Sequence, residues 1–180
     1  MATNSLSISF IDAHRGRPMR YFTREWYDSV QNASRLMARE KRWKDKLADP
    51  LYNTARTNYS KYLDTIKSEI APDVMALIGL HLHDAKVIES ELSDRILSIV
   101  VEDMYAQGRY NRQMKIHFFE VDAVEGIDGF IGQDIDYDEI FVNPNGTYVY
   151  SALSHKTEFS ICFRSVTLSS VAGGRKTGDR

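Results

Sequence analysis

Two histidines and an aspartate lie within four residues of one another: His81, His83 and Asp84. In extended backbone the side chains of residues i and i+2 point to the same side, so the two imidazoles would be presented together. Imidazole and carboxylate groups are zinc ligands, and His117 or His155 would supply the missing one. The second half of a metallo-hydrolase motif is absent from the sequence. The alternative is structural, with Asp84 accepting hydrogen bonds from backbone amides at a junction.

An acidic run occupies residues 134–139, and its three aspartates alternate with other residues. The same spacing opens a calcium-binding loop, but that loop requires glycine at its sixth position and glutamate at its twelfth. This chain has Glu139 and Asn145 there. We therefore interpret the run as a strand with a solvated acidic face that contacts a protein partner. The predicted contact residues are Asp134, Asp136, Tyr137, Asp138 and Glu139.

Four basic residues recur at steps of four, three and four, so they share one face of a helix: Arg35, Arg39, Arg42 and Lys46. Such a stripe can bind the phosphates of a nucleic acid. The net charge of −2 argues against a dedicated nucleic-acid binder. Residues 1–83 carry 13 Lys and Arg against 9 Asp and Glu, whereas the rest carry 10 against 16. The stripe is therefore also consistent with a solvated face that docks on the acidic part of the chain.

The chain offers little for nucleophilic catalysis. Its one cysteine, Cys162, lies between Ile161 and Phe163 in a strand-like run, which is typical of a small buried apolar side chain. Neither a G-x-S-x-G motif nor a G-x-x-x-x-G-K-[ST] phosphate loop occurs. We therefore assign no catalytic residue and expect no cofactor.

The N-terminal part of the chain predicts helices. Thr23 is a suitable N-cap, and apolar residues recur at helical spacing after it. Asp49-Pro50 would end this helix, because the residue before a proline avoids the α region. A second apolar stripe covers residues 52–70, and Pro72 would begin a short third helix. The two longer helices are expected to form a hairpin.

Past residue 82 the apolar period changes to two, which is typical of strands. The turn Asn143-Pro144-Asn145-Gly146 predicts a hairpin. Because short turns and no helical crossovers join the strands, they would form an antiparallel sheet. The predicted fold class is α+β, with an N-terminal helical hairpin plus a short third helix, followed by a five- to six-stranded antiparallel sheet. The expected strands are residues 85–90, 96–101, 114–121, 138–142, 147–153 and 159–168.

The composition, with 43% hydrophobic and 27% charged residues, is that of an ordinary globular protein. We expect a flexible leader at 1–18, a helical part at 19–82, a β part at 83–170 that forms one compact unit with it, and a flexible tail at 171–180. A single cysteine cannot form an internal disulfide, and the N-terminus lacks the features of a signal peptide. No apolar run reaches the ~18 residues of a membrane span. These features predict a cytoplasmic protein without membrane association.

The segment M-R-Y-F-T-R-E-W-Y at residues 19–27 resembles the opening of a bacterial family known as domain of unknown function 4085. The segments H-D-A-K-V at 83–87 and Y-D-E-I-F at 137–141 look like the β-rich second half of that family. The resemblance covers about residues 19–168, and it implies that residues 1–18 are an extension. Typical members of that family look longer than this chain between the opening helix and the strand that begins with His83-Asp84. The family implies no activity, so the resemblance assigns no catalytic residue.

These observations favour a non-catalytic protein-binding module of bacterial origin with an immunity-type, phage-conflict or regulatory role. It would present a sheet face or the acidic run to its partner. Two alternatives stay open. One is a metal-dependent hydrolase that uses His81, His83 and Asp84, and the other is a weak nucleic-acid binder that uses the basic first helix.

Overall fold

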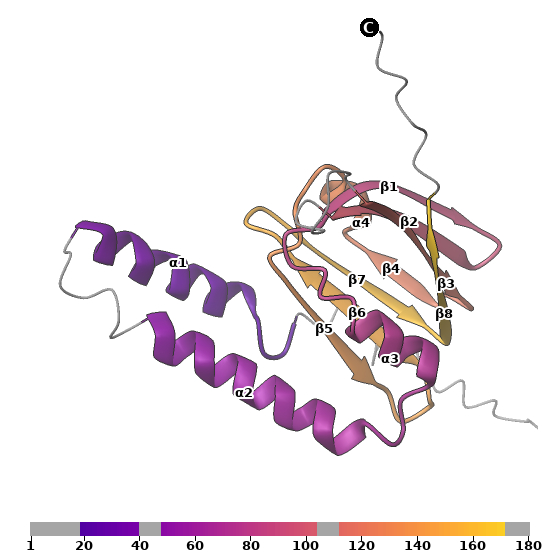
Figure 1. Ribbon diagram of the computed structural model, residues 1–180, viewed down its shortest axis with the longest axis horizontal. Helices are drawn as coiled ribbons and strands as arrows, with labels where there is room; N and C mark the ends of the chain where they lie inside the picture. The colour runs from indigo at the N-terminus through magenta and orange to yellow at the C-terminus, as the bar shows by residue number, and fades with distance from the viewer. Residues whose placement is uncertain (1–18, 40–47, 104–111, 172–180) are drawn as a thin grey trace, which may run out of the picture.

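The computed structural model describes residues 19–39, 48–103 and 112–171, and these form an α+β fold (Figure 1). Three helices come first: α1 (Arg24–Arg39), α2 (Ala48–Ile66) and α3 (Pro72–Ile78). Eight strands and a short helix follow, namely β1 (Lys86–Ser93), β2 (Ile96–Asp103), β3 (Arg112–Phe119), β4 (Ala123–Glu125), α4 (Ile127–Phe130), β5 (Tyr137–Val142), β6 (Tyr148–Leu153), β7 (Glu158–Phe163) and β8 (Ser165–Ser170). The predicted leader at 1–18 and tail residues 172–180 lie outside the described residues.

The helix boundaries follow from local chemistry. Thr23 caps α1, since its Oγ1 accepts the backbone N–H of Trp26 at 3.1 Å, which confirms the predicted N-cap. The predicted end of the first helix at Asp49-Pro50 is wrong, because Pro50 lies in the first turn of α2. Proline is tolerated there because the first N–H groups of a helix have no intrahelical partner. The third helix begins at Pro72, as predicted.

The β part contains two four-stranded antiparallel sheets, in the orders β1-β2-β3-β8 and β4-β7-β6-β5. The sequence predicts a single sheet of five to six strands, and the difference arises at two crossing points. The strand expected at 159–168 is interrupted at Arg164, where the chain leaves one sheet as β7 and enters the other as β8. A similar transfer occurs at Glu120, between β3 and β4. Nε of Arg164 lies 3.3 Å from Oε2 of Glu120, so an ion pair joins the two crossing points.

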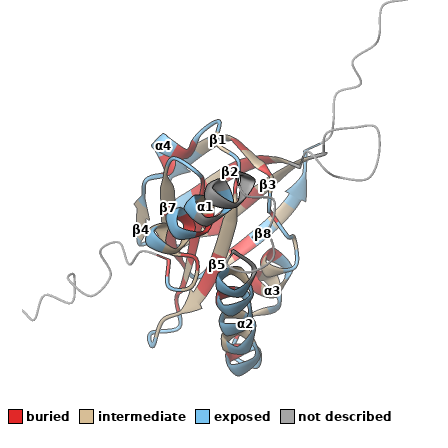
Figure 2. Ribbon diagram, turned by 90° about the vertical axis from the view of Figure 1, so that its left-hand side faces the viewer, coloured by how far each residue is buried: buried red, intermediate tan, exposed pale blue. Residues whose placement is uncertain are grey.

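The two sheets pack face to face, and their inner faces form the main hydrophobic core (Figure 2). The Phe118 ring of β3 lies 4.9 Å from that of Phe163 in β7 and 5.9 Å from that of Tyr150 in β6, measured between ring centroids. The helix α3 adds Val74 and Leu77 to this core. Aromatic and branched side chains on the inner faces therefore hold the sheets together.

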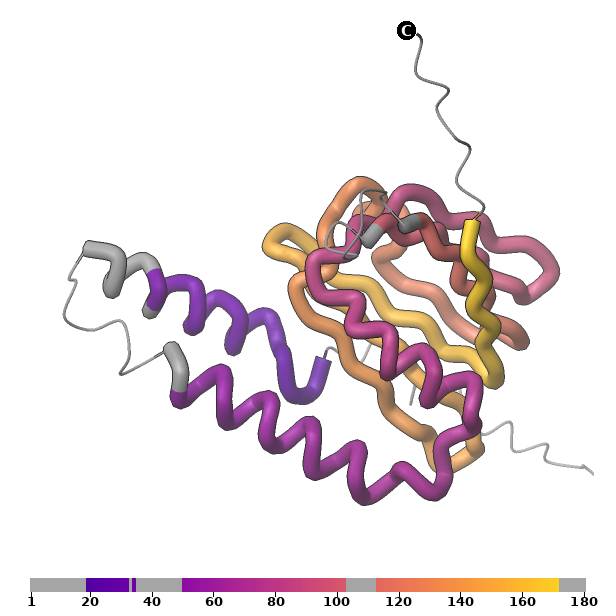
Figure 3. The backbone as a smooth tube through the Cα atoms, viewed as in Figure 1, coloured from indigo at the N-terminus to yellow at the C-terminus, as the bar shows by residue number. Residues whose placement is uncertain are grey.

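A second, smaller cluster joins the first two helices to the outer face of sheet β4-β7-β6-β5. Figures 1 and 3 show α1 and α2 side by side, extending away from the sheets. The buried members of this cluster are Met19, Phe22, Tyr27, Ala55 and Leu153. The segment before α1 and the base of the helix pair therefore cover one sheet face.

Candidate functional site

The predicted contact residues 134–139 start in the loop before β5 and continue into that strand. The side chain of Asp134 is 51% exposed, and its Oδ1 lies 3.9 Å from Nζ of Lys86. Asp136 accepts a hydrogen bond of 2.9 Å from the Tyr27 hydroxyl, and the half-buried ring of Tyr137 stacks on Phe22 with 5.2 Å between centroids. The run does not form the solvated acidic face that the alternation suggests, because the segment before α1 and the start of α1 pack over it.

Glu139 has no exposed surface and anchors this segment. Its carboxylate accepts the backbone N–H of Arg20 through Oε1, and that of Tyr21 through Oε2 at 3.1 Å. Burial raises the pKa of Glu139 to about 7, while the donating backbone N–H groups hold this pKa down. The guanidinium of Arg20 lies over the ring of Phe141, 4.6 Å from its centroid. Glu139 therefore serves as an internal hydrogen-bond acceptor in the folded chain.

Asp138 lies on the other side of β5 from Glu139, because successive side chains of a strand alternate. Burial raises the pKa of Asp138 to about 6, whereas His81 and His83 lower this pKa. The buried Tyr150 hydroxyl faces this carboxyl without completing a hydrogen bond of normal geometry, and burial raises the pKa of Tyr150. Asp138 is thus a partly buried carboxyl on the opposite side of β5 from Glu139.

The outer edge of β5 is covered by α2. The backbone N–H of Ile140 donates to the Tyr59 hydroxyl at 2.7 Å, and that of Val142 donates to the Tyr62 hydroxyl at 3.0 Å. Burial raises the pKa of both tyrosines, so their hydroxyls stay protonated. Two tyrosines of one helix therefore satisfy edge N–H groups that would otherwise attract another strand.

The junction histidines are not arranged as a metal site requires. The backbone at His81 and Asp84 has positive φ values of 51° and 66°, so the extended conformation expected there is wrong. Nδ1 of His83 donates to the backbone carbonyl of Asp136 at 2.5 Å, and its Nε2 lies 3.6 Å from Oδ2 of Asp84. The described part of the chain contains no group of three or more His, Cys, Asp or Glu that could hold a metal ion. His83 thus makes a junction hydrogen bond.

The other histidines proposed as third ligands lie apart from this junction. Nδ1 of His117 is 2.8 Å from Oγ of Ser98, within sheet β1-β2-β3-β8. His155 is exposed in the turn between β6 and β7.

Two further predictions concern the basic stripe and the cysteine. Arg35 and Arg39 lie on α1, but their side chains are outside the described residues, as are Arg42 and Lys46 altogether. The nucleic-acid prediction is therefore untested. Cys162 is buried, and burial raises the pKa of its thiol, as fits a small core side chain.

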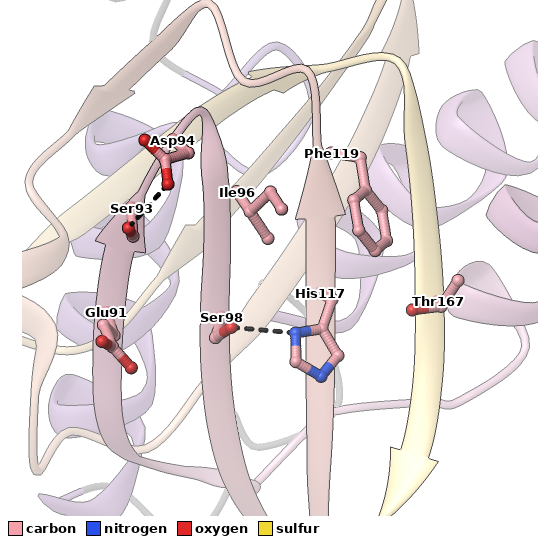
Figure 4. A pocket seen from close by; sticks show the side chains of 8 residues that line it. All are labelled: Glu91, Ser93, Asp94, Ile96, Ser98, His117, Phe119 and Thr167. Carbon is pink, nitrogen blue, oxygen red and sulfur yellow. Dashed lines mark hydrogen bonds between the residues drawn. The ribbon is translucent and has the colours of Figure 1, made fainter.

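The outer face of sheet β1-β2-β3-β8 carries a shallow groove of about 540 Å³ (Figure 4). Strand register places a row of polar side chains across it, since Glu91 pairs with Ser98, Ser98 with His117, and His117 with Thr167. Beside this row lie the apolar side chains of Ile96, 36% exposed, and half-buried Phe119. Ser93 and Asp94 complete the lining. The groove thus combines hydrogen-bonding groups with an accessible apolar patch.

Alternation along the strand predicted at 114–121 puts Ile116 and Phe118 on one face, and the structure buries both in the core. The opposite face of that strand follows directly, and it carries His117 and Phe119. The groove was missed because its residues come from four strands whose neighbours in the sheet are not all neighbours in the sequence.

A scan against protein-family models, a search of curated proteins and a search of solved structures each found no match to this chain. The resemblance of residues 19–27 to a bacterial family therefore stays a prediction. Among the described helices, none is both long enough and apolar enough to span a membrane.

Proposed function

We propose that this chain is a non-catalytic protein-binding module and that its binding surface is the outer face of sheet β1-β2-β3-β8. The groove on that face carries the proposal. Its polar row offers hydrogen-bond donors and acceptors, and Ile96 and Phe119 offer apolar area beside them. Protein interfaces combine an apolar centre with such polar surroundings.

The sequence offers two surfaces for a partner, a sheet face and the acidic run. The acidic run is occupied internally, because Asp136 and Glu139 accept hydrogen bonds from the segment at 20–27. Ser98, His117 and Thr167 stay accessible to a partner on the open sheet face. Accessibility therefore favours the sheet face. A module of this kind acts by occupying its partner, which fits the immunity-type, phage-conflict or regulatory role that the sequence suggests.

Two isoleucines provide a matched test. Ile96 lies in the groove and is 36% exposed, whereas Ile131 is 37% exposed and does not line it. We expect tagged wild-type protein and the Ile131→Arg variant to capture the same protein at a stoichiometric amount from cells that naturally produce the chain. The Ile96→Arg variant should bind this protein with an affinity about tenfold or more weaker. A photo-cross-linking residue at Phe119 should label that same protein.

Three results would contradict the proposal. The first is capture that Ile96→Arg and Ile131→Arg weaken equally. The second is the absence of a partner together with turnover of a small-molecule substrate. The third is a stoichiometric metal in the eluate without a partner, which would favour the metal-dependent hydrolase and direct mutagenesis to His81, His83 and Asp84.

A further inference from the structure

The sheet edges of this protein are covered unequally. Tyr59 and Tyr62 cover the edge of β5. Asp73 Oδ2 accepts the outward N–H of Val166 at the start of β8, at 2.9 Å. The first part of β1 is covered by residues 132–135. The backbone N–H of Val87 donates to the Gln133 carbonyl at 3.0 Å, and the N–H of Gly132 donates to the Val87 carbonyl at 2.8 Å. Residues 89–93 of β1 come after this covered part.

The backbone of residues 89–93 leaves hydrogen-bonding groups facing outward. A tight turn at Asp94 and Arg95, both with positive φ, pairs Ser93 with Ile96. Antiparallel pairing alternates inward and outward groups, so the N–H and C=O of Ser90 and Leu92 point away from β2. Within the described ranges no hydrogen bond satisfies these outward groups. This part of β1 can therefore accept another strand.

The side chains of this edge define the chemistry of that strand. Glu89 and Glu91 lie on the outer face, where their cross-strand partners are Val100 and Ser98. Leu92 lies on the opposite face and is 57% exposed, more than the other large hydrophobic residues in the described part of the chain. An added strand would meet two carboxylates on one side and an apolar side chain on the other.

Among the described residues, no basic side chain forms an ion pair with Glu89 or Glu91. Arg95 pairs instead with Asp122, its Nη2 lying 2.5 Å from Oδ1. Lys115 shares the outer face but lies on β3, two strands from β1. Pairing of the edge with a second copy of itself, centred on Glu91, would place like charges directly opposite, which is unfavourable.

We propose that residues 89–93 of β1 accept an extended segment of a partner protein in which Lys or Arg alternates with apolar residues. The segment would become a fifth strand beside β1, with its basic side chains toward Glu89 and Glu91 and an apolar side chain over Leu92. This inference rests on the proposed protein-binding function and names the partner's chemistry. Because Glu91 and Ser93 also line the groove, the added strand would extend one wall of the same surface.

The test uses the isotope-labelled chain and a short capped peptide in which Lys and Val alternate. The peptide should shift amide resonances of residues 89–93, and a peptide in which Glu and Val alternate should not. Ser90→Pro removes an outward N–H from this edge and should weaken binding of the Lys-Val peptide by about tenfold or more. Ser170→Pro makes the same change on the opposite edge of the sheet, at β8, and should leave binding unchanged.

A charge-reversal variant covers the case in which Ser90→Pro fails to fold. The chain with both Glu89→Lys and Glu91→Lys should no longer bind the Lys-Val peptide and should instead bind the Glu-Val peptide. Absence of Lys-Val binding, or equal weakening by Ser90→Pro and Ser170→Pro, would overturn the inference.

The natural partner separates failure of the inference from failure of the proposed function. If that partner binds Ser90→Pro normally but not Ile96→Arg, the edge inference is wrong while the proposed function stands. If no partner protein binds the wild type, the proposed function fails whatever the peptide does.

Discussion

The two sheets of this protein share one core but satisfy their outer polar groups differently. The outer face and edge of sheet β4-β7-β6-β5 are closed by its own chain, through Glu139, Tyr59 and Tyr62. The outer face of sheet β1-β2-β3-β8 is open, and its Ser98–His117 pair lies in a shallow groove. Buried polar groups require a partner within the fold, whereas exposed ones can exchange water for a ligand. The closed face therefore contributes to stability, and the open face is where binding is expected.

The largest contrast is expected between two neighbouring phenylalanines of β3. Phe118 is fully buried between the sheets, and Phe119 faces the groove. Phe118→Ala leaves a cavity in the core and should lower the free energy of unfolding by about 3–5 kcal/mol. Phe119→Ala should lower it by only about 1 kcal/mol, since the Phe119 ring is half-buried and its removal leaves no enclosed cavity. Urea unfolding measures both, and equal losses would show that the outer face is as well packed as the core.

The next effect concerns pH and the closed face. Burial raises the pKa of Glu139 from 4.5 to about 7, so the folded state binds this proton more tightly than the unfolded state. Protonation of Glu139 therefore contributes most to the unfolding free energy below pH 4.5. This contribution falls by about 3 kcal/mol as the pH rises to about 7. Asp138 should change the stability with pH in the same direction, because burial raises its pKa to about 6.

Glu139→Gln isolates this effect, because the amide does not titrate. As the pH rises from 4.5 to 7, the unfolding free energy of the wild type should fall relative to that of Glu139→Gln. Urea titrations at matched ionic strength measure both. Asp134→Asn is the control for loss of a carboxylate from the same run, since the Asp134 side chain is 51% exposed, and it should change the unfolding free energy by less than about 0.5 kcal/mol. A pH-independent difference for Glu139→Gln would mean that its carboxyl is effectively solvated.

A smaller effect is expected at the covered edge of β5. Tyr59→Phe removes the hydroxyl that accepts the Ile140 N–H and leaves that group without an acceptor. The loss should be about 1–2 kcal/mol of unfolding free energy. Tyr52→Phe is the matched control on the same helix, because the Tyr52 hydroxyl makes no hydrogen bond among the described residues, and it should change stability by less than about 0.5 kcal/mol. Equal losses would show that α2 does not protect this edge.

The element types were predictable from the sequence because they depend on local patterns. The Thr23 cap, the start of α3 at Pro72 and the hairpin around Asn145-Gly146 each rest on a few adjacent residues. The division into two sheets was not predictable. It depends on Arg164 and Glu120, where the chain changes sheets, and a period of two is the same in either sheet.

The candidate site was less predictable than the fold. The acidic residues at 134–139 look solvated in the sequence because charged side chains are usually exposed. Burial of Glu139 depends on the backbone N–H groups of Arg20 and Tyr21, which lie more than a hundred residues earlier in the chain. The groove likewise depends on which strands become neighbours, so Ser98 and His117 meet only in the folded sheet.

The smallest effect is expected at the Ser98–His117 pair, and it completes the comparison. Ser98→Ala removes a hydrogen bond that water can replace on the open face, so stability should change by less than about 0.5 kcal/mol. If the pair contacts a partner, the same substitution should weaken partner binding by more than it weakens folding, as measured by titration with the captured protein. A variant that loses stability and binding in proportion would identify Ser98 as a structural residue of the sheet, and the open face would then resemble the closed one.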